Sequence, residues 1–240
     1  MPEPAPPSAG LFITGTDTSV GKTLVTAAVA RSLRGQGRGV VVCKPVATGA
    51  RQVGGRWLAD DTVALAEATG LTGEWERVTP WAFADPVAPP LAARQQGVTL
   101  ALAAVAGAVL NRARPGAALL VEGVGGLLCP LTDGETVADL VRELGLGLVV
   151  VARRSLGTLN HTLLTLEVAR ARGLSVAGVV VSETVPPDGL ADETNVDELR
   201  RLGVGVLAVV PHRAGGAGGE EPALAGVDWW RLCFPAGHGR

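Results

Sequence analysis

The sequence predicts an α/β fold in which a mostly parallel central sheet is flanked by helices on both faces. Strand-like and helix-like segments alternate from the first apolar run to about residue 211, which is typical of this class. The strand-like runs are rich in Val and nearly free of charge, as strands buried on both faces are. In addition, a Gly-rich turn over residues 15–23 joins the first strand to the first helix.

The first elements are apolar runs separated by glycines. Residues 11–14 form a short apolar strand, and a helix over residues 23–33 closes just before a glycine. Residues 40–43 read Val-Val-Val-Cys and predict a second buried strand. A Gly-rich loop over residues 49–55 then leads to a helix over residues 61–68.

The later elements continue the alternation, and Pro and Gly mark where helices stop. An Ala-rich helix over residues 99–112 ends before Arg114-Pro115-Gly116, and a helix over residues 159–172 ends at Gly173. The remaining elements are strands over residues 117–121, 148–152, 176–181 and 204–210 and helices over residues 137–144 and 195–202. Because crossovers between parallel strands are right-handed, the strand-to-helix loops meet at one sheet edge, where ligands bind.

Composition predicts a folded globular chain. Hydrophobic residues make up 47% of the chain and charged residues 18%. We expect a single domain over residues 1–240, with residues 1–9 as a disordered leader and residues 213–240 as a flexible C-terminal segment. The formal net charge of −2 gives no reason to expect nucleic acid or an anionic membrane as a partner.

Targeting and cysteine patterns favour a cytoplasmic protein. The first ten residues lack the basic and apolar parts of a secretory signal. The longest nearly uncharged stretch, residues 98–110, is far shorter than the roughly 20 residues that span a bilayer. The three cysteines are widely spaced without a CxxC pair, which predicts free thiols rather than a zinc site or a disulfide framework.

Lysine is rare in this chain. Of its 21 basic residues, only Lys22 and Lys44 are lysine. Where arginine is the rule, a retained lysine is a candidate for a site that needs a compact ammonium instead of a planar guanidinium. Both lysines fall within motifs that stand out on other grounds.

The turn after the first strand has the composition of a phosphate-binding loop. It reads Gly15-Thr16-Asp17-Thr18-Ser19-Val20-Gly21-Lys22-Thr23 and opens a helix. In such a loop, backbone N–H groups and the positive helix end hold phosphates, the lysine reaches the β and γ oxygens, and the threonine hydroxyl ligates Mg²⁺. This predicts the P-loop NTPase fold, although five residues rather than the usual four separate the glycines. The plainer alternative is a helix N-terminus that binds no ligand.

Charged residues also follow other predicted strands. Lys44 comes directly after the second strand, where it could stabilise charge on a transferring phosphoryl group or be an ordinary surface lysine. Glu122 ends a buried strand and precedes a Gly-rich segment, which is a suitable place for a second Mg²⁺ ligand. Asp60 and Asp61 open the next helix, where carboxylates also serve as caps.

Six motifs together resemble the dethiobiotin synthetase family of the biotin pathway. They read GTDTSVGKT, KPVATG, ADDTVAL, PWAFADPVAP, VEGVGG and LGTLNHTLLT, and the resemblance covers roughly residues 10–212. It accounts for the five-residue loop, which is that family's own form. It implies an enzyme that uses Mg²⁺ and ATP to close a cyclic urea from 7,8-diaminononanoate and CO₂, by way of a carbamate and a carbamic–phosphoric anhydride.

The resemblance also implies roles for individual residues. Lys22 and Lys44 would be the catalytic cations, and Thr23, Asp61 and Glu122 would bind Mg²⁺. The nucleotide would contact residues 15–23 together with Glu122, Gly125, Ser182, Pro211 and His212. The second substrate would lie near Thr18, Lys44, Thr48 and Gly125. Its carboxylate would bind the N–H groups of Thr158, Leu159 and Asn160 on a helix of the partner subunit, which implies a homodimer with the substrate site at the interface.

Two departures from the family pattern affect the nucleotide site. Ser19 stands where many members carry an acidic residue, and Ser182-Glu183 replaces an Asn-Asp pair whose Asn reads adenine. A serine offers fewer hydrogen bonds in a different geometry. The resemblance makes ATP the expected nucleotide. Because Ser182 replaces the residue that reads adenine, another nucleoside triphosphate is an alternative.

Other functions within this fold class remain open. A switch ATPase of the partitioning or septum-placement type would carry a second lysine early in the loop, at the position of Asp17. A small-molecule kinase would need an arginine-rich lid, for which Arg51 and Arg56 are candidates. An amidoligase related to cobyrinate synthesis usually adds a glutaminase domain, of which the sequence gives no sign.

Overall fold

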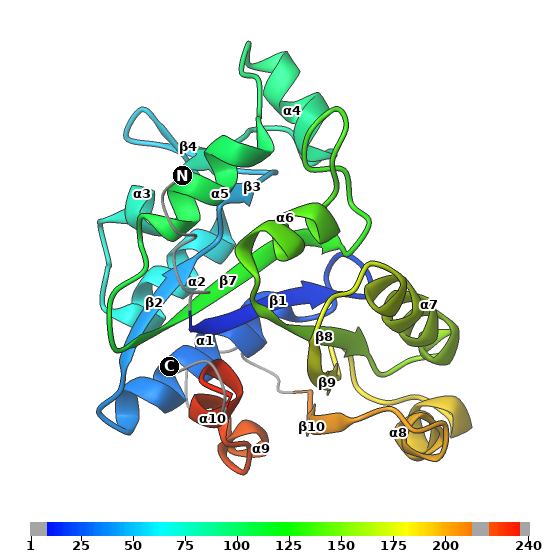
Figure 1. The fold of residues 1–240 in the computed structure, drawn as a ribbon. Helices are drawn as coiled ribbons and strands as arrows, with labels where there is room; N and C mark the ends of the chain where they lie inside the picture. Colours follow the sequence, from blue (N-terminus) through cyan, green and yellow to red (C-terminus); the bar gives the residue numbers. More distant parts are fainter. Residues whose placement is uncertain (1–8, 213–220, 236–240) are drawn as a thin grey trace.

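A computed structural model describes residues 9–212 and 221–235 of the chain. Its central feature is a six-stranded sheet in the order β10-β9-β8-β1-β7-β2, with every neighbouring pair parallel (Figure 1). This confirms the predicted α/β class. The leader expected over residues 1–9 lies almost wholly outside the described residues.

The elements have the following bounds. The strands are β1 (Gly10–Gly15), β2 (Gly39–Cys43), β3 (Val46–Ala47), β4 (Arg51–Val53), β5 (Arg56–Leu58), β6 (Trp81–Ala82), β7 (Ala117–Gly126), β8 (Gly147–Arg153), β9 (Val176–Ser182) and β10 (Val206–Val210). The helices are α1 (Lys22–Gly35), α2 (Asp60–Thr69), α3 (Trp75–Val78), α4 (Pro89–Gln95), α5 (Leu102–Leu110), α6 (Val137–Leu144), α7 (Thr158–Ala171), α8 (Leu190–Arg201), α9 (Pro222–Ala225) and α10 (Trp229–Cys233).

Both faces of the sheet are covered by helices. Because side chains alternate along a strand, Phe12 of β1 enters the core beneath α4 to α8, whereas Leu11 and Ile13 enter the core beneath α1 to α3, α9 and α10. All three side chains are buried. Burial on both faces explains why the central strands are uninterrupted apolar runs.

The strand order determines what surrounds the phosphate loop. β1 lies between β7 and β8, so the loop after β1 has the ends of β7 and β2 on one side and the ends of β8, β9 and β10 on the other. Because all six strands are parallel, their carboxyl ends meet at this edge. The residues that follow these strands therefore converge, as the sequence predicted.

Several local predictions were incomplete. The Gly-rich loop over residues 49–55 is largely a hairpin of β4 and β5, which Gly54 and Gly55 turn with φ values of 57° and 81°. The short elements β3, β6, α3 and α4 had no clear periodic signal. Helix α8 begins at residue 190 instead of 195, and β7 extends to residue 126 because Gly126 still pairs with Gly15 of β1.

The second half of the C-terminal segment is packed rather than flexible. α9 and α10 lie against β10, α1 and β1, and the Trp229 side chain is 1% exposed. Its indole N–H donates to the carbonyl of Leu224 at 2.9 Å, and the Arg38 guanidinium lies 4.5 Å from the ring centroid of Trp230. The flexible-segment prediction is therefore wrong for residues 222–233, while residues 213–220 and 236–240 lie outside the described residues.

No helix among the described residues is both long enough and apolar enough to cross a membrane.

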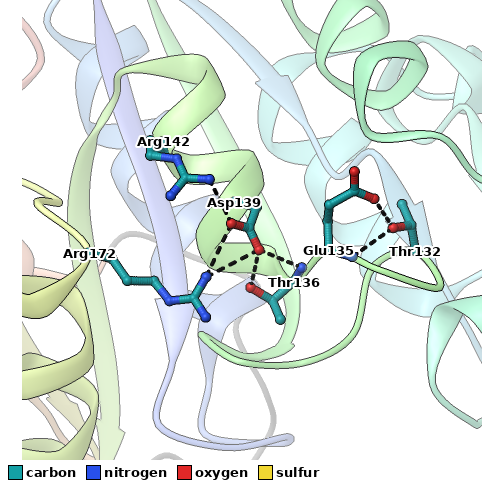
Figure 2. Close-up of polar contacts among 6 residues, drawn as sticks. All are labelled: Thr132, Glu135, Thr136, Asp139, Arg142 and Arg172. Atoms are coloured by element: carbon teal, nitrogen blue, oxygen red, sulfur yellow. Dashed lines mark hydrogen bonds and ion pairs between the residues drawn. The ribbon is translucent and has the colours of Figure 1, made fainter.

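Helices α6 and α7 are joined through one carboxylate (Figure 2). Asp139 accepts hydrogen bonds from the Thr136 N–H and hydroxyl, at 2.8 and 2.7 Å, which closes a capping box at the start of α6. The same carboxylate binds Arg142 at 2.9 Å and Arg172, at the end of α7, at 3.1 Å. Burial alone would raise the pKa of Asp139, but the Thr136 hydrogen bonds and the two arginines together lower it.

We predict that Asp139→Asn lowers the free energy of unfolding by about 1 kcal/mol at neutral pH, because the cap and the link to α7 weaken. The pKa of Asp139 is lowered in the folded state, so its contribution is present above the ordinary value of 3.8 and is lost as pH falls below it. Urea unfolding of both proteins at about pH 7 and about pH 3 should show the difference shrink in acid. A difference that persists unchanged in acid would contradict the role of the charge.

Candidate active site

The loop between β1 and α1 depends on both of its glycines. A side chain on Gly15 would lie 2.7 Å from the carbonyl oxygen of Asp17. Gly21 has φ 96°, and a side chain there would lie 2.6 Å from the Ser182 hydroxyl. Both glycines are therefore required by the geometry of the loop. Within the loop, the Lys22 ammonium donates to the carbonyl of Asp17 at 2.9 Å.

Four side chains from four elements converge beside this loop. The Lys44 ammonium lies 2.6 Å from Asp61 Oδ2 and 2.6 Å from Glu122 Oε1. The Thr23 hydroxyl, at the start of α1, lies 2.8 Å from Asp61 Oδ1 and 2.8 Å from Glu122 Oε1. Lys44 directly follows β2 and Glu122 lies within the neighbouring strand β7, and the two are in register because Cys43 pairs with Val121. The cluster contains Lys44, one of the two lysines predicted as catalytic, and the three residues predicted to bind Mg²⁺, whereas Lys22 lies in the loop beside it.

The cluster is largely shielded from solvent. The side chains of Lys44 and Glu122 are 5% and 0% exposed, whereas that of Asp61 is 45% exposed. Burial alone would lower the pKa of Lys44, but Glu122 and Asp61 together raise it, so Lys44 is charged. Burial alone would raise the pKa of Asp61. The charge of Lys44 and the hydrogen bonds from Lys44 and Thr23 outweigh this effect, so the pKa is lowered. The pKa of Lys22 is lowered by burial and then by Lys44.

The donor atoms of this cluster suit a magnesium ion. The Thr23 hydroxyl has one proton and can donate to only one of its two carboxylate neighbours at a time. Glu122 Oε2 is buried and has no hydrogen-bond partner among the described residues. Mg²⁺ prefers such oxygen ligands and usually completes its shell with water and phosphate oxygens. Residues 9–212 and 221–235 contain no group of three or more His, Cys, Asp or Glu placed so that it could hold a metal ion.

Nine of the expected ligand-binding residues line one cleft of about 370 Å³. They are Thr18, Ser19, Gly21, Lys22, Thr23, Lys44, Thr48, Asp61 and Gly125. Val124 and Thr184 also line the cleft, although the sequence analysis missed both. Thr184 could have been found from its position two residues after β9, at the ligand-binding edge of the sheet.

Other expected nucleotide residues lie outside the cleft lining. Ser182 ends β9, is 1% exposed and packs behind Gly21. Pro211 and His212 follow β10, and the His212 N–H donates to the Glu183 carboxylate at 3.0 Å. Thr16 donates its N–H to the carbonyl of Val151 at 2.9 Å, so this amide belongs to the sheet. Whether these residues bind nucleotide stays a prediction.

An acidic residue in the loop is balanced by a cation that the sequence analysis missed. Asp17 Oδ2 lies 2.5 Å from Arg153 Nη2, at the end of β8, while Asp17 Oδ1 accepts the Thr18 N–H at 2.7 Å. A carboxylate near a phosphate site repels the ligand unless its charge is compensated. Arg153 supplies that compensation, and only the tertiary structure brings it to Asp17.

The start of α7 has the features of an anion site. Gly157 precedes the helix and no side chain caps it, so the N–H groups of Leu159 and Asn160 lack a side-chain acceptor there, whereas the Thr158 N–H donates to the Ser155 carbonyl at 3.1 Å. The Thr158 hydroxyl is buried and has no hydrogen-bond partner among the described residues. These three residues do not line the cleft of the same subunit. Their predicted position opposite the cleft of a partner subunit stays a prediction.

Comparison with known proteins identifies the family. A family profile described as an AAA domain matches residues 9–215. A relative from Anaeromyxobacter dehalogenans strain 2CP-C, named ATP-dependent dethiobiotin synthetase BioD, is 47% identical over 193 residues, which cover 80% of this chain and 85% of that protein. A relative of the same name from Mycolicibacterium vanbaalenii is 41% identical over 220 residues, covering 91% and 93%. The chain belongs to the dethiobiotin synthetase family.

Solved structures share the fold of this family member at low sequence identity. A ParA family ATPase from Chlorobium tepidum aligns with a TM-score of 0.52 and 12% identity, covering 96% of this chain and 95% of that protein. The cell division ATPase MinD from Pyrococcus furiosus aligns with a TM-score of 0.51 and 16% identity, covering 85% and 84%. At such identity the likeness shows the fold alone, and it confirms the predicted P-loop NTPase fold.

We predict that Lys44→Met lowers the free energy of unfolding by about 3 kcal/mol, because it leaves the buried Glu122 carboxylate without its cation. Adding Glu122→Gln to that variant should restore most of the lost stability, since the uncompensated buried charge is then gone. Guanidinium unfolding of the two variants and the parent protein tests both statements. If Lys44→Met is as stable as the parent protein, the inference that the buried Glu122 carboxylate needs Lys44 is wrong.

Proposed function

We propose that this chain is an ATP-dependent dethiobiotin synthase that carboxylates 7,8-diaminononanoate and closes its ureido ring. The proposal depends mainly on one observation: beside the phosphate loop, four side chains contact one another, namely Lys44, Asp61, Glu122 and Thr23. Membership of the dethiobiotin synthetase family supports the same activity. The substrates are small molecules, and the cytoplasmic location expected from the sequence stays a prediction.

The phosphate loop holds the nucleotide at the N-terminus of α1. Lys22 turns from the Asp17 carbonyl to the β and γ oxygens, and the N–H groups at the start of the helix bind the remaining charge. Thr23, Asp61 and Glu122 are the residues that would hold Mg²⁺, which would supply positive charge to neutralise the phosphates. Lys44 lines the same cleft as Lys22 and Thr23, so in this proposal the γ-phosphate would react beside it.

The chemistry then requires positioning and charge stabilisation rather than a covalent nucleophile. One amine of the substrate takes up CO₂ and loses a proton, which forms a carbamate. A carbamate oxygen attacks the γ-phosphorus, and the bond to ADP breaks. The second amine attacks the carbamoyl carbon, the C–O bond to phosphate breaks, and the cyclic urea, phosphate and a proton are released. Lys44 stabilises the negative charge on the carbamate and on the transferring phosphoryl group.

The substrate is held at both ends in this proposal. Thr48, Thr18 and Gly125 line the cleft beside Lys44, where the two amines react. The uncapped start of α7 from a partner subunit receives the far carboxylate. A homodimer with the substrate site at its interface follows from this arrangement and is part of the proposal.

The decisive experiment measures phosphate release from Mg-ATP with and without diaminononanoate and bicarbonate, and repeats it with CTP and GTP. We expect release to require both co-substrates and mass spectrometry to find the cyclic urea. The comparison of nucleotides tests the base preference left open by Ser182. Release that is indifferent to the diamine would refute the synthase and favour a switch ATPase.

We predict that Glu122→Gln raises the Mg²⁺ concentration needed for half-maximal ATP binding by at least about tenfold, because one buried ligand oxygen loses its charge. Asp60→Asn is the matched control, since Asp60 neighbours Asp61 in sequence but is exposed and pairs with Arg51. Mg²⁺ titrations of nucleotide binding and of phosphate release check the prediction. Equal titrations for Glu122→Gln and the parent would remove Glu122 from the metal site.

A further inference from the structure

The cleft has a reacting end and a nucleoside end. Lys44 and Asp61 line one end, near the carboxyl ends of β2 and β7, and Thr184 after β9 also lines the cleft. If the γ-phosphate reacts beside Lys44, as the proposed function requires, the nucleoside must extend towards the ends of β8, β9 and β10. On that side Thr184 lines the cleft, and we call the segment from Ser182 to Thr184 the nucleoside-side wall, although its other two residues lie outside the lining.

One arginine ties this wall to its neighbours. Arg154 follows β8, and its N–H donates to the Ser182 carbonyl at 2.9 Å. Its guanidinium binds Glu183 Oε1 at 2.5 Å, the Glu193 carbonyl at 3.2 Å and the Asp192 carbonyl. Each of its three guanidinium nitrogens therefore has a partner, and two of these partners lie in the first turn of α8.

Glu183 completes the connection to β10. Its Oε2 accepts the His212 N–H at 3.0 Å, and its own N–H donates to the Val210 carbonyl at 2.9 Å. The side chain of Glu183 is 8% exposed and that of Arg154 is 21% exposed, so water screens this ion pair far less than a surface pair. The two residues thus join the ends of three strands and the start of α8.

Ser182 and Thr184 flank Glu183 and meet the phosphate loop. A side chain on Gly21 would lie 2.6 Å from the Ser182 hydroxyl and 3.9 Å from a methyl group of Thr184. The position of Glu183 therefore determines how closely this wall approaches the loop. Its carboxylate is itself occupied by Arg154 and His212 and is not directed to a ligand.

We propose that the Arg154–Glu183 ion pair positions the nucleoside-side wall of the cleft and thereby sets the affinity for the nucleoside part of the nucleotide. Neither side chain contacts the nucleotide in this proposal, so both are positioning residues. This proposal takes one point from the proposed function, namely that the γ-phosphate lies beside Lys44 and the nucleoside at the other end of the cleft. It predicts that the pair affects nucleoside binding without affecting the phosphate loop or the chemical step.

The test compares binding of Mg-ATP and of inorganic tripolyphosphate with Mg²⁺ to the full-length chain and to Arg154→Met. We expect the Kd for ATP to rise at least about tenfold, because the variant leaves the Glu183 carboxylate without its cation. The Kd for tripolyphosphate should change by less than about twofold, since the phosphate loop is untouched. In turnover assays KM for ATP should rise while kcat at saturation falls by less than about threefold.

Three further variants separate positioning from general stability. Arg201→Met is the matched control, because Arg201 forms an exposed pair with Glu198 at the far end of α8, and both Kd values should stay unchanged. Arg154→Lys keeps the charge but lacks the planar fork, so its Kd for ATP should lie between those of the parent and Arg154→Met. Arg154→Met combined with Glu183→Gln should bind ATP more tightly than Arg154→Met alone, because the uncompensated carboxylate is removed.

The outcomes distinguish this inference from the proposed function. Equal losses of ATP and tripolyphosphate binding would show a general structural role and overturn the proposal, as would an unchanged Kd for ATP in a folded Arg154→Met. Because both probes are measured by binding, the result stands even if no cyclic urea is formed. Conversely, cyclic urea formation with unchanged ATP affinity would support the synthase and reject the role of the pair.

Discussion

The ion pair between Lys44 and Glu122 is the constraint on which the rest of the site depends. Its two charges lie 2.6 Å apart with almost no solvent exposure, so neither could be buried without the other. The pair forms because β2 and β7 are neighbours in register, with Cys43 opposite Val121. Asp61 binds Lys44 and accepts a hydrogen bond from Thr23 in the same cluster. These contacts hold the first turns of α1 and α2 against the sheet.

The charges of the cleft are matched before any ligand binds. Lys44 pairs with Asp61 and Glu122, and the nearby Lys22 supplies a second positive charge, so these four side chains together carry no net formal charge. A Mg²⁺–triphosphate would add net negative charge, which the N–H groups of the loop and the positive end of α1 can accept. Arg153 keeps Asp17 from adding further negative charge to the loop. The charged groups of the site are therefore in place before the substrate brings its own charge. Electrostatic catalysis is most effective when such groups need not move during the reaction.

The strand order divides the proposed site into a side that serves the chemistry and a side that serves nucleoside binding. β7 and β2, on one side of β1, supply Glu122 and Lys44, which serve the chemistry in the proposed mechanism. β8, β9 and β10, on the other side, are followed by Arg154, Glu183 and His212, and Glu183 binds the other two. Affinity for the nucleoside and reactivity of the phosphate can therefore change independently, because their residues follow different strands.

The sequence by itself determined the fold class, the phosphate loop and the residues of the Lys44–Glu122 cluster. These signals are local, because hydrophobic periodicity, Gly-Lys-Thr and a charge at a strand end can each be read within a few residues. Only the tertiary structure decided the strand order, the hairpin after β3, the burial of Trp229 and the partners of Asp17 and Glu183. Asp17 and Arg153, for instance, are 136 residues apart, and no local pattern encodes a contact between two such distant side chains. Packing against the rest of the chain selects such contacts, and it does so only once the sheet has formed.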